Sequence, residues 1–246
     1  IGAILKDQAQ RYDKKTFFLY KEEECSYKQL YDRAFQFAAG LSNLGVEKGT
    51  MVCNMMHSSP DYLYMWFGLS MIGGVEVPIN TAYKGYLLEY LINYSEAEFI
   101  IIEEEFLERI RFIEDNLTSL KKLIVHRQNS GSNPKNPTSF EMLLYEEIFD
   151  KGGEIPDVDV YFSDLSSIVF TSGTTGPSKG AMLPVNFIYR LATRHVEIMR
   201  YEEKDVLYNF LPFFHVAGKF QTLAALLIGG KIVLQEKFSV NTFWEN

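Results

Sequence analysis

The sequence predicts an α/β fold with mainly parallel sheets flanked by helices. Short apolar segments alternate with stretches that carry apolar residues at helical spacing, from about residue 17 to residue 235. Several short segments are apolar throughout, as strands covered by helices on both faces require. A glycine-rich loop directly follows one such segment, which is where parallel sheets bind their ligands.

Residues 1–127 are expected to form a first α/β subdomain. A short hairpin ends before Ser26, which forms a capping-box pattern with Gln29 at the start of a helix that stops at Gly45. Ser59 caps a second helix, with Pro60 in its first turn. Further helices are predicted at residues 86–94 and 106–117, and strands at residues 51–56, 75–79, 99–102 and 123–126.

Residues 128–163 are expected to form a linker with a short helix near residues 140–147. Its first part, to residue 138, is rich in Asn, Ser, Gly and Pro and has no periodicity. A second α/β segment follows at residues 164–246. Its predicted strands are residues 167–171, 206–210 and 231–235, and its predicted helices are residues 185–199 and 217–228.

Composition indicates an ordinary soluble globular protein and names no ligand. The net charge is −8, which argues against nucleic acid, because nucleic-acid-binding proteins present net basic surface. Cys25 and Cys53 form no zinc spacing and are expected to be free core thiols. The longest uncharged stretch, residues 62–75, is too short to span a bilayer. With no signal peptide visible, a cytoplasmic location is expected, and the sequence does not indicate an oligomeric state.

The loop at residues 171–180, TSGTTGPSKG, has the composition of an anion-binding turn. Four hydroxyl side chains within its first five positions can donate hydrogen bonds to phosphate oxygens. Its glycines let backbone amides approach a ligand, and Lys179 adds a mobile positive charge. It is not a Walker A loop, because Ser178 stands where that pattern needs its second glycine. A flexible turn with an exposed lysine is the alternative interpretation.

This loop resembles the phosphate-binding signature of the adenylate-forming superfamily, which includes acyl-CoA synthetases and peptide-synthetase adenylation domains. The family pattern ends in Gly-x-Pro-Lys-Gly; here Pro177 stands one position earlier, while Lys179 and the glycines stay in register. A second segment, LPFFHVAG at residues 211–218, is similar to the family's LPxFHxxG stretch beside the acyl pocket. Residues 74–80 and 236–244 are more weakly similar to crotonobetaine/carnitine-CoA ligases. The resemblance implies the amino-terminal region of the acyl-CoA synthetase-like fold.

The resemblance also implies a function: an ATP-dependent carboxylic acid–CoA ligase that forms an acyl-adenylate and then an acyl-CoA. Its substrates would be a small-molecule carboxylic acid, which the sequence does not specify, with ATP, Mg²⁺ and CoA. His215 and Gly218 would border the acyl pocket and Lys237 would lie near CoA; a packed core histidine and a solvated lysine are the alternatives. The residues assigned to ATP binding are Thr171, Ser172, Gly173, Thr174, Thr175, Gly176 and Lys179.

No catalytic residue is expected within this chain, because the family's catalytic lysine and its Tyr-Gly-x-Thr-Glu segment correspond to positions beyond Asn246. Residues 1–246 alone are therefore expected to be inactive. No metal ligand is predicted either, because the run of glutamates at residues 103–105 is expected to be the solvated start of a helix. Two other functions stay open: an adenylation domain that loads a carrier protein, and a non-catalytic nucleotide-binding module.

Overall fold

The computed structural model describes residues 1–127, 138–150, 153–171, 178–238 and 240. Its helices are α1 (Gly2–Tyr12), α2 (Tyr27–Asn43), α3 (Pro60–Met71), α4 (Tyr86–Tyr94), α5 (Leu107–Arg111), α6 (Tyr145–Asp150), α7 (Val185–Met199) and α8 (Val216–Ile228), with the 3₁₀ turns η1 (Glu104–Phe106) and η2 (Glu114–Asn116). Its strands are β1 (Thr16–Tyr20), β2 (Glu23–Ser26), β3 (Met51–Met55), β4 (Val75–Pro78), β5 (Phe99–Glu103), β6 (Lys122–His126), β7 (Glu141–Leu144), β8 (Leu165–Thr171), β9 (Lys179–Pro184), β10 (Val206–Asn209) and β11 (Lys231–Leu234).

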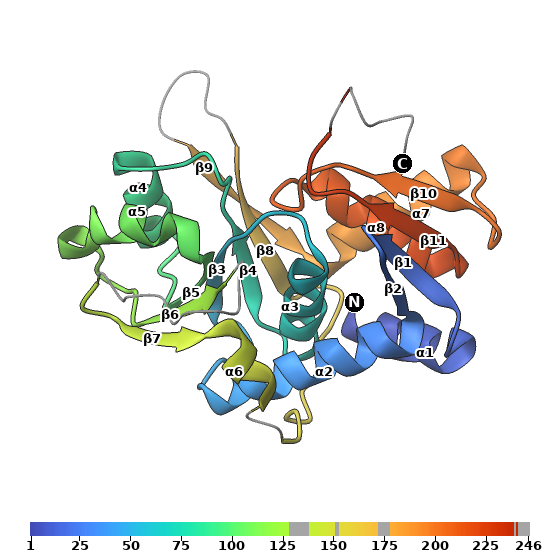
Figure 1. Cartoon of the computed structure of the whole chain (residues 1–246), viewed down its shortest axis with the longest axis horizontal. Coiled ribbons are helices and arrows are strands. Elements are labelled where there is room, and N and C mark those ends of the chain that lie inside the picture. Colours follow the sequence, from blue (N-terminus) through green and yellow to red (C-terminus); the bar gives the residue numbers. More distant parts are fainter. Residues whose placement is uncertain (128–137, 151–152, 172–177, 239, 241–246) are drawn as a thin grey trace.

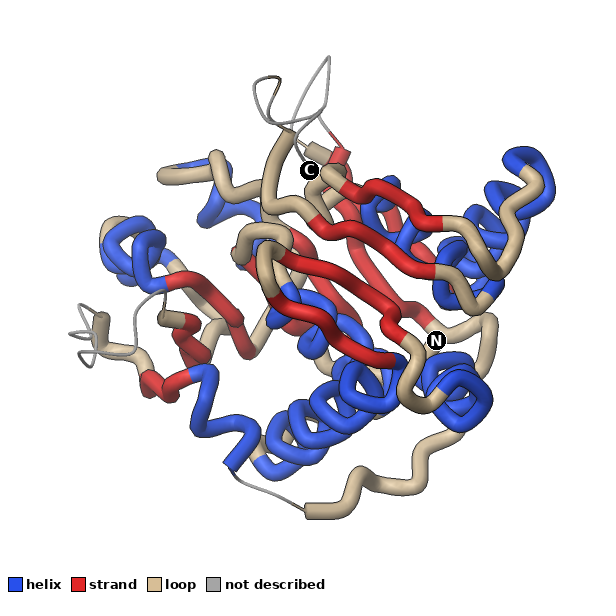
Figure 2. The backbone as a smooth tube through the Cα atoms, turned by 45° about the vertical axis from the view of Figure 1, so that its right-hand side comes forward, coloured by secondary structure: helices blue, strands red, loops and turns tan. Residues whose placement is uncertain are grey.

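The described strands form two sheets, with helices packed around them (Figures 1 and 2). The larger has the strand order β7-β6-β5-β3-β4-β8-β9, and the smaller has the order β10-β11-β1-β2. Neighbouring strands are parallel except in the hairpins β1–β2 and β8–β9. The predicted α/β class with mainly parallel sheets is therefore confirmed. Both sheets combine strands from residues 1–127 with strands from residues 164–246, and the predicted division of the chain stays a prediction.

Alternating side chains of β5 explain why helices cover both faces of the larger sheet. Phe99 and Ile101 belong to a core cluster that also contains residues of α2 and α3. Ile100 and Ile102 belong to a second cluster with residues of α4 and α5. Because successive side chains of a strand point to opposite faces, an all-apolar strand fills both cores. Burying each of these isoleucines stabilises the fold by about 1.5–3 kcal/mol.

Helix α3 lies between the two sheets. Its Tyr64 contacts the smaller sheet, since its ring lies 6.4 Å from that of Phe18 on β1 and its hydroxyl lies 3.9 Å from Cys25 Sγ on β2. On the other side, Tyr62 donates a hydrogen bond of 2.6 Å to Glu76 on β4 of the larger sheet. Both cysteines are free and buried, as predicted. The helix therefore joins the sheets through polar as well as apolar contacts.

The capping box at the start of α2 is confirmed. The backbone N–H of Gln29 donates to Ser26 Oγ over 3.1 Å, and the backbone N–H of Ser26 donates to Gln29 Oε1 over 2.8 Å. These two bonds satisfy donors that a helix start leaves without an intrahelical partner. The same principle holds at α3, where Ser59 Oγ accepts from the backbone N–H of Tyr62 over 3.2 Å.

Two predicted helices were wrong in part. Residues 106–117 form the short helix α5 followed by the 3₁₀ turn η2, because apolar spacing of three or four residues suits either kind of turn. Residues 141–144 form the edge strand β7, which pairs with β6 through Leu123 and Met142. That pairing is invisible to local periodicity. Helix α1 and strand β9 had no counterpart in the sequence prediction.

The prediction for residues 103–105 also needs correction. Glu103 is the last residue of β5, and its side chain is only 5% exposed. Glu105 is exposed and lies in the turn η1, so only the second part of the run is the solvated helix start that was expected. Glu103 is buried because the end of β5 faces His57, which lies 46 positions away in the sequence.

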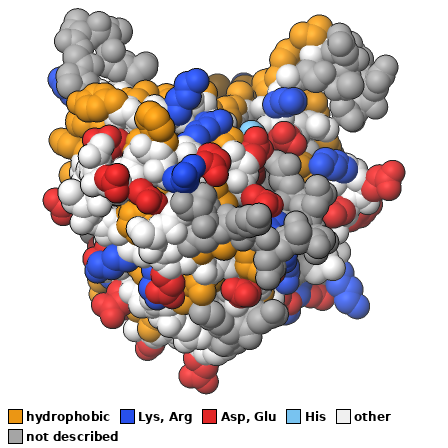
Figure 3. All heavy atoms as spheres, turned by 60° about the vertical axis from the view of Figure 1, so that its left-hand side comes forward, with side chains coloured by type: hydrophobic (Ala, Val, Ile, Leu, Met, Phe, Trp, Pro, Cys, Tyr) orange, Lys and Arg blue, Asp and Glu red, His pale blue; other side chains and the backbone are white. Residues whose placement is uncertain are grey.

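Charged side chains are mixed on the surface. Over the face shown in Figure 3, Lys and Arg side chains lie interspersed with Asp and Glu among the coloured residues. Every described helix is too short or too polar to cross a bilayer.

Candidate functional site

The β8–β9 hairpin carries the two described ends of the predicted phosphate loop. Thr171 ends β8 and Lys179 begins β9, and these two residues are register partners in the antiparallel pair. Thr171 Oγ1 donates to the Lys179 carbonyl over 3.4 Å. Both side chains are exposed. Because β8 runs parallel to β4, Thr171 lies at the carboxyl edge of the sheet, as predicted for a ligand site.

The five other residues assigned to ATP binding lie outside the described residues. They are Ser172, Gly173, Thr174, Thr175 and Gly176. Ser178 lies shortly after them and contacts α4, because Tyr90 Oη donates a hydrogen bond of 3.1 Å to the Ser178 carbonyl. Helix α4 therefore anchors the chain just before β9, next to the predicted phosphate-binding residues.

His215 begins helix α8 and belongs to the other side of the site. It is the N-cap residue, and its Nδ1 accepts a hydrogen bond of 3.2 Å from the backbone N–H of Ala217. This bond fixes the ring tautomer, since Nδ1 must carry a lone pair and the proton of the neutral ring lies on Nε2. The His215 side chain is exposed in the structure, whereas the alternative interpretation expected a packed core residue.

Thr171 and His215 line one pocket of about 470 Å³. Strand β8 contributes Val169, Phe170 and Thr171, and the segment at the start of α8 contributes Phe214, His215 and Val216. Its remaining lining comes from β4 and the turn after it, from α4, from β9 and from α7. The structure therefore brings together the two segments that the sequence had singled out separately, in a cavity of the size that small-molecule ligands occupy.

Aromatic side chains in this pocket were not predicted as site residues. They are Tyr83, Phe170, Phe187 and Phe214. Phe187 is 39% exposed although it is large and apolar. The sequence alone shows only a helix with an apolar face, so it could not reveal that Phe187 is exposed. The lining residues that the structure describes include no Asp, Glu, Lys or Arg.

Gly218 and Lys237 are not among the residues that line this pocket. Gly218 is buried in α8, and a Cβ atom there would lie 2.7 Å from the Leu211 carbonyl oxygen. Glycine at this position thus allows α8 to approach the turn at residues 211–213. Lys237 is exposed in the bend that follows β11.

A buried ion pair supports the helix that carries His215. Lys219 on α8 and Glu76 on β4 are 4% and 1% exposed, and their side chains form a salt bridge. Tyr62 Oη contacts both Glu76 Oε1, at 2.6 Å, and the Phe213 carbonyl oxygen, at 3.1 Å. Burial lowers the pKa of Lys219, and the Glu76 carboxylate acts in the opposite direction. The network joins β4, α3 and α8 directly behind the pocket.

Comparison with known proteins identifies the family. A family model described as AMP-binding enzyme matches residues 5–246. The crotonobetaine/carnitine–CoA ligase of Proteus mirabilis is 27% identical over 97% of this chain and 47% of its own length. The 4-hydroxybutyrate–CoA ligase 2 of Metallosphaera sedula is 27% identical over 95% of this chain and 43% of its own length. The chain thus spans about half the length of these curated relatives.

Solved structures show the same fold. A long-chain-fatty-acid-CoA ligase from Archaeoglobus fulgidus superposes with a TM-score of 0.85 at 22% identity, covering 100% of this chain and 48% of the other. An anthranilate CoA ligase in complex with anthranoyl-AMP also gives a TM-score of 0.85, at 24% identity, and covers 96% of this chain and 45% of the other. The fold defines the class of α/β domain that these ligase structures contain. The chain belongs to the AMP-binding enzyme family.

Proposed function

We propose that the protein is an ATP-dependent carboxylic acid–CoA ligase. One observation carries the proposal: Thr171, at the edge of the phosphate loop, and His215, in the segment similar to the acyl-pocket stretch, line the same pocket. Family membership and the acid–CoA ligase names of the relatives support the same reaction. The two free, buried cysteines suit the reducing cytoplasm, which we propose as its location.

The proposed reaction has two steps. A carboxylate oxygen of the acid attacks the α-phosphorus of ATP, a new P–O bond forms, and pyrophosphate leaves. The CoA thiol then loses its proton and attacks the acyl carbonyl, a C–S bond forms, and AMP leaves. Mg²⁺ would accompany ATP and neutralise phosphate charge. Positioning and charge neutralisation are the main contributions that a protein can make to such steps.

The residues of this chain would contribute to the first step. Lys179, Thr171 and the loop at residues 172–176 would hold the β- and γ-phosphates that leave as pyrophosphate. His215 would form part of the wall against the acyl group, with Gly218 allowing its helix to approach. Lys237 would contact CoA in the second step, which is consistent with its exposed position.

The pocket lining favours an acid whose acyl group presents apolar surface. Such a group can be buried against the rings of Phe170, Phe187 and Phe214. Burial of apolar area contributes about 25 cal/mol per Å² to the binding free energy. The described lining offers no charged side chain that could pair with a second carboxylate. We therefore propose monocarboxylic acids with apolar or aromatic acyl groups as the substrate class.

The test is acid-dependent pyrophosphate exchange by the complete protein, with a panel of monocarboxylic acids. An active acid is then incubated with ATP and with either hydroxylamine or CoA. We expect hydroxamate without CoA, because an acyl-adenylate is trapped, and acyl-CoA when CoA replaces hydroxylamine. Adenylate formation without any acyl-CoA product would point to an adenylation domain that loads a carrier protein. ATP binding with no exchange for any acid would point to a non-catalytic module.

A further inference from the structure

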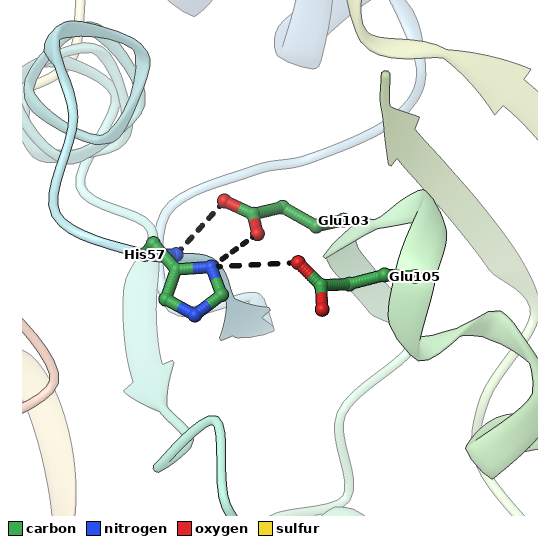
Figure 4. A group of neighbouring side chains, drawn as sticks. All are labelled: His57, Glu103 and Glu105. Atoms are coloured by element: carbon green, nitrogen blue, oxygen red, sulfur yellow. Dashed lines mark hydrogen bonds and ion pairs between the residues drawn. The ribbon is translucent and has the colours of Figure 1, made fainter. Parts of the chain in front are cut away.

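Three acidic or imidazole side chains converge at a second place on the carboxyl edge of the larger sheet. His57 lies two residues after β3, Glu103 ends β5, and Glu105 lies in the following turn η1 (Figure 4). From β3 the chain first adds β4 on one side and then returns to add β5 on the other. The crevice between β3 and β5 is therefore a topological switch point, the position where open α/β sheets bind ligands.

Glu103 holds both the backbone and the ring of His57. Its Oε1 accepts a hydrogen bond of 2.9 Å from the His57 backbone N–H, and its Oε2 lies 2.5 Å from His57 Nδ1. Glu105 Oε1 approaches the same ring nitrogen at 3.9 Å. One nitrogen and two carboxylate oxygens, one from each residue, thus lie within 4.8 Å of one another. His57 and Glu103 are fixed by these hydrogen bonds, so they need little further ordering to bind an ion.

The charges of the cluster favour a cation. Glu103 is 5% exposed, and within the described part of the chain its ion-pair partner is His57. Glu105, which is 47% exposed, brings a second carboxylate to the same nitrogen. A dication would be attracted by both carboxylates, and with a neutral imidazole it would keep the buried Glu103 carboxylate neutralised, whose burial as an uncompensated charge would be costly.

We propose that His57, Glu103 and Glu105 form a binding site for a transition-metal dication, with Zn²⁺ as the preferred ion. An imidazole nitrogen favours Zn²⁺ over Mg²⁺ or Ca²⁺, which prefer sites made of oxygen atoms alone. Ligand atoms lie about 2.0–2.2 Å from Zn²⁺, so two ligands of one tetrahedral ion are about 3.4 Å apart. The ion would therefore replace the short His57–Glu103 hydrogen bond and take the lone pair of Nδ1, with the ring proton on Nε2.

The site would keep an open coordination position. Three protein ligands leave the fourth position of a tetrahedral ion to water or to a ligand. His57 and Glu103 line a polar cleft of about 750 Å³, and His126 and Arg127 from the end of β6 line it as well. Strand β4 separates β3 from the β8–β9 hairpin in the sheet order. The site is thus distinct from the phosphate loop, and the proposal does not depend on the proposed function.

The test is titration of the nucleotide-free protein, prepared without a histidine tag, with ZnCl₂ in a calorimeter. We expect one saturable equivalent that a large excess of Mg²⁺ does not displace. Replacement with Co²⁺ should give a visible ligand-field spectrum that His57→Gln abolishes, because the imidazole nitrogen would no longer bind the ion. Absence of a saturable equivalent, or a Co²⁺ spectrum that survives His57→Gln, would overturn the proposal.

Matched glutamate variants separate ligation from diffuse acidic attraction. Glu105→Gln is expected to weaken Zn²⁺ binding at least about tenfold, and because Glu105 is exposed this variant should stay folded. Glu104→Gln removes the same charge from the adjacent residue, which does not belong to the cluster, and should bind Zn²⁺ like the parent. Equal weakening by both changes, or no weakening by Glu105→Gln, would show that Glu105 is not a ligand.

Discussion

The pair formed by Glu76 and Lys219 shows how single residues determine the structure behind the pocket. Both side chains are nearly fully buried, and Tyr62 and Asn54 donate further hydrogen bonds to the Glu76 carboxylate. Burial raises the pKa of Tyr62, and the neighbouring Glu76 carboxylate raises it further, so the phenol stays a donor. The pair therefore depends on both charges and on this set of donors.

Lys219→Met is expected to destabilise the protein by about 3–5 kcal/mol, because Glu76 is left as a buried carboxylate without its cation. Adding Glu76→Gln to Lys219→Met should restore most of this loss, since neither charge then remains. Urea unfolding of the parent and the three variants, analysed as a double-mutant cycle, measures the coupling. A Lys219→Met variant as stable as the parent would contradict the importance of the pair.

Residues that stand together in one segment could be assigned to a candidate site from the sequence, and residues paired over long distances could not. Thr171, Lys179 and the glycines near them stand together in one loop, so their composition alone indicated an anion site. Glu76 and Lys219 are 143 positions apart, and His57 and Glu103 are 46 positions apart. Only the folded sheet brings these partners together, so no local pattern could have predicted either pair.

At the scale of elements, close packing of α2 against α6 depends on a glycine inside a helix. A Cβ atom at Gly40 would lie 2.0 Å from the carbonyl oxygen of Ile148 and 2.6 Å from its Cγ2 atom. Ile148 is itself fully buried. The two helices can therefore pack this closely only if residue 40 has no side chain.

Gly40→Ala is expected to destabilise the protein by about 1–3 kcal/mol through overpacking. In an exposed helix the same change would stabilise by up to about 1 kcal/mol, so the sign of the effect tests the packing. Gln36→Ala, at an exposed position of the same helix, is the control and should change stability by less than about 0.5 kcal/mol. Denaturant unfolding of both variants gives the comparison, and a stabilising Gly40→Ala would contradict the observed contact.

Element types were predicted best where the signal is local. The capping box of α2 and the apolar strand β5 needed no knowledge of partners. Strand β7 forms because it pairs with β6. This pairing leaves no local signal in the sequence of residues 141–144. Strand β9 forms because it pairs with β8 in an antiparallel hairpin. Its own sequence, KGAMLP, contains a glycine and a proline that weaken any strand signal.

At the scale of the whole molecule, the pocket depends on how the two halves of the chain share their sheets. Thr171 lies on the larger sheet, and His215 begins the helix that leads from β10 to β11 of the smaller sheet. Helix α3 and the pair between Glu76 and Lys219 hold these sheets against each other. The site was predicted as separate loops, and the fold shows how Thr171 and His215 come to face one cavity.

The most direct test of the central claim, that the β8–β9 hairpin holds the phosphates of ATP, is acid-dependent pyrophosphate exchange by the complete protein carrying Lys179→Ala. Lys204→Ala, which removes an exposed lysine paired with Glu202, is the control. We predict that Lys179→Ala lowers the exchange rate by about 10²-fold or more while the circular dichroism spectrum stays unchanged, and that Lys204→Ala has no effect. Exchange at the parent rate in the Lys179→Ala variant would contradict the claim.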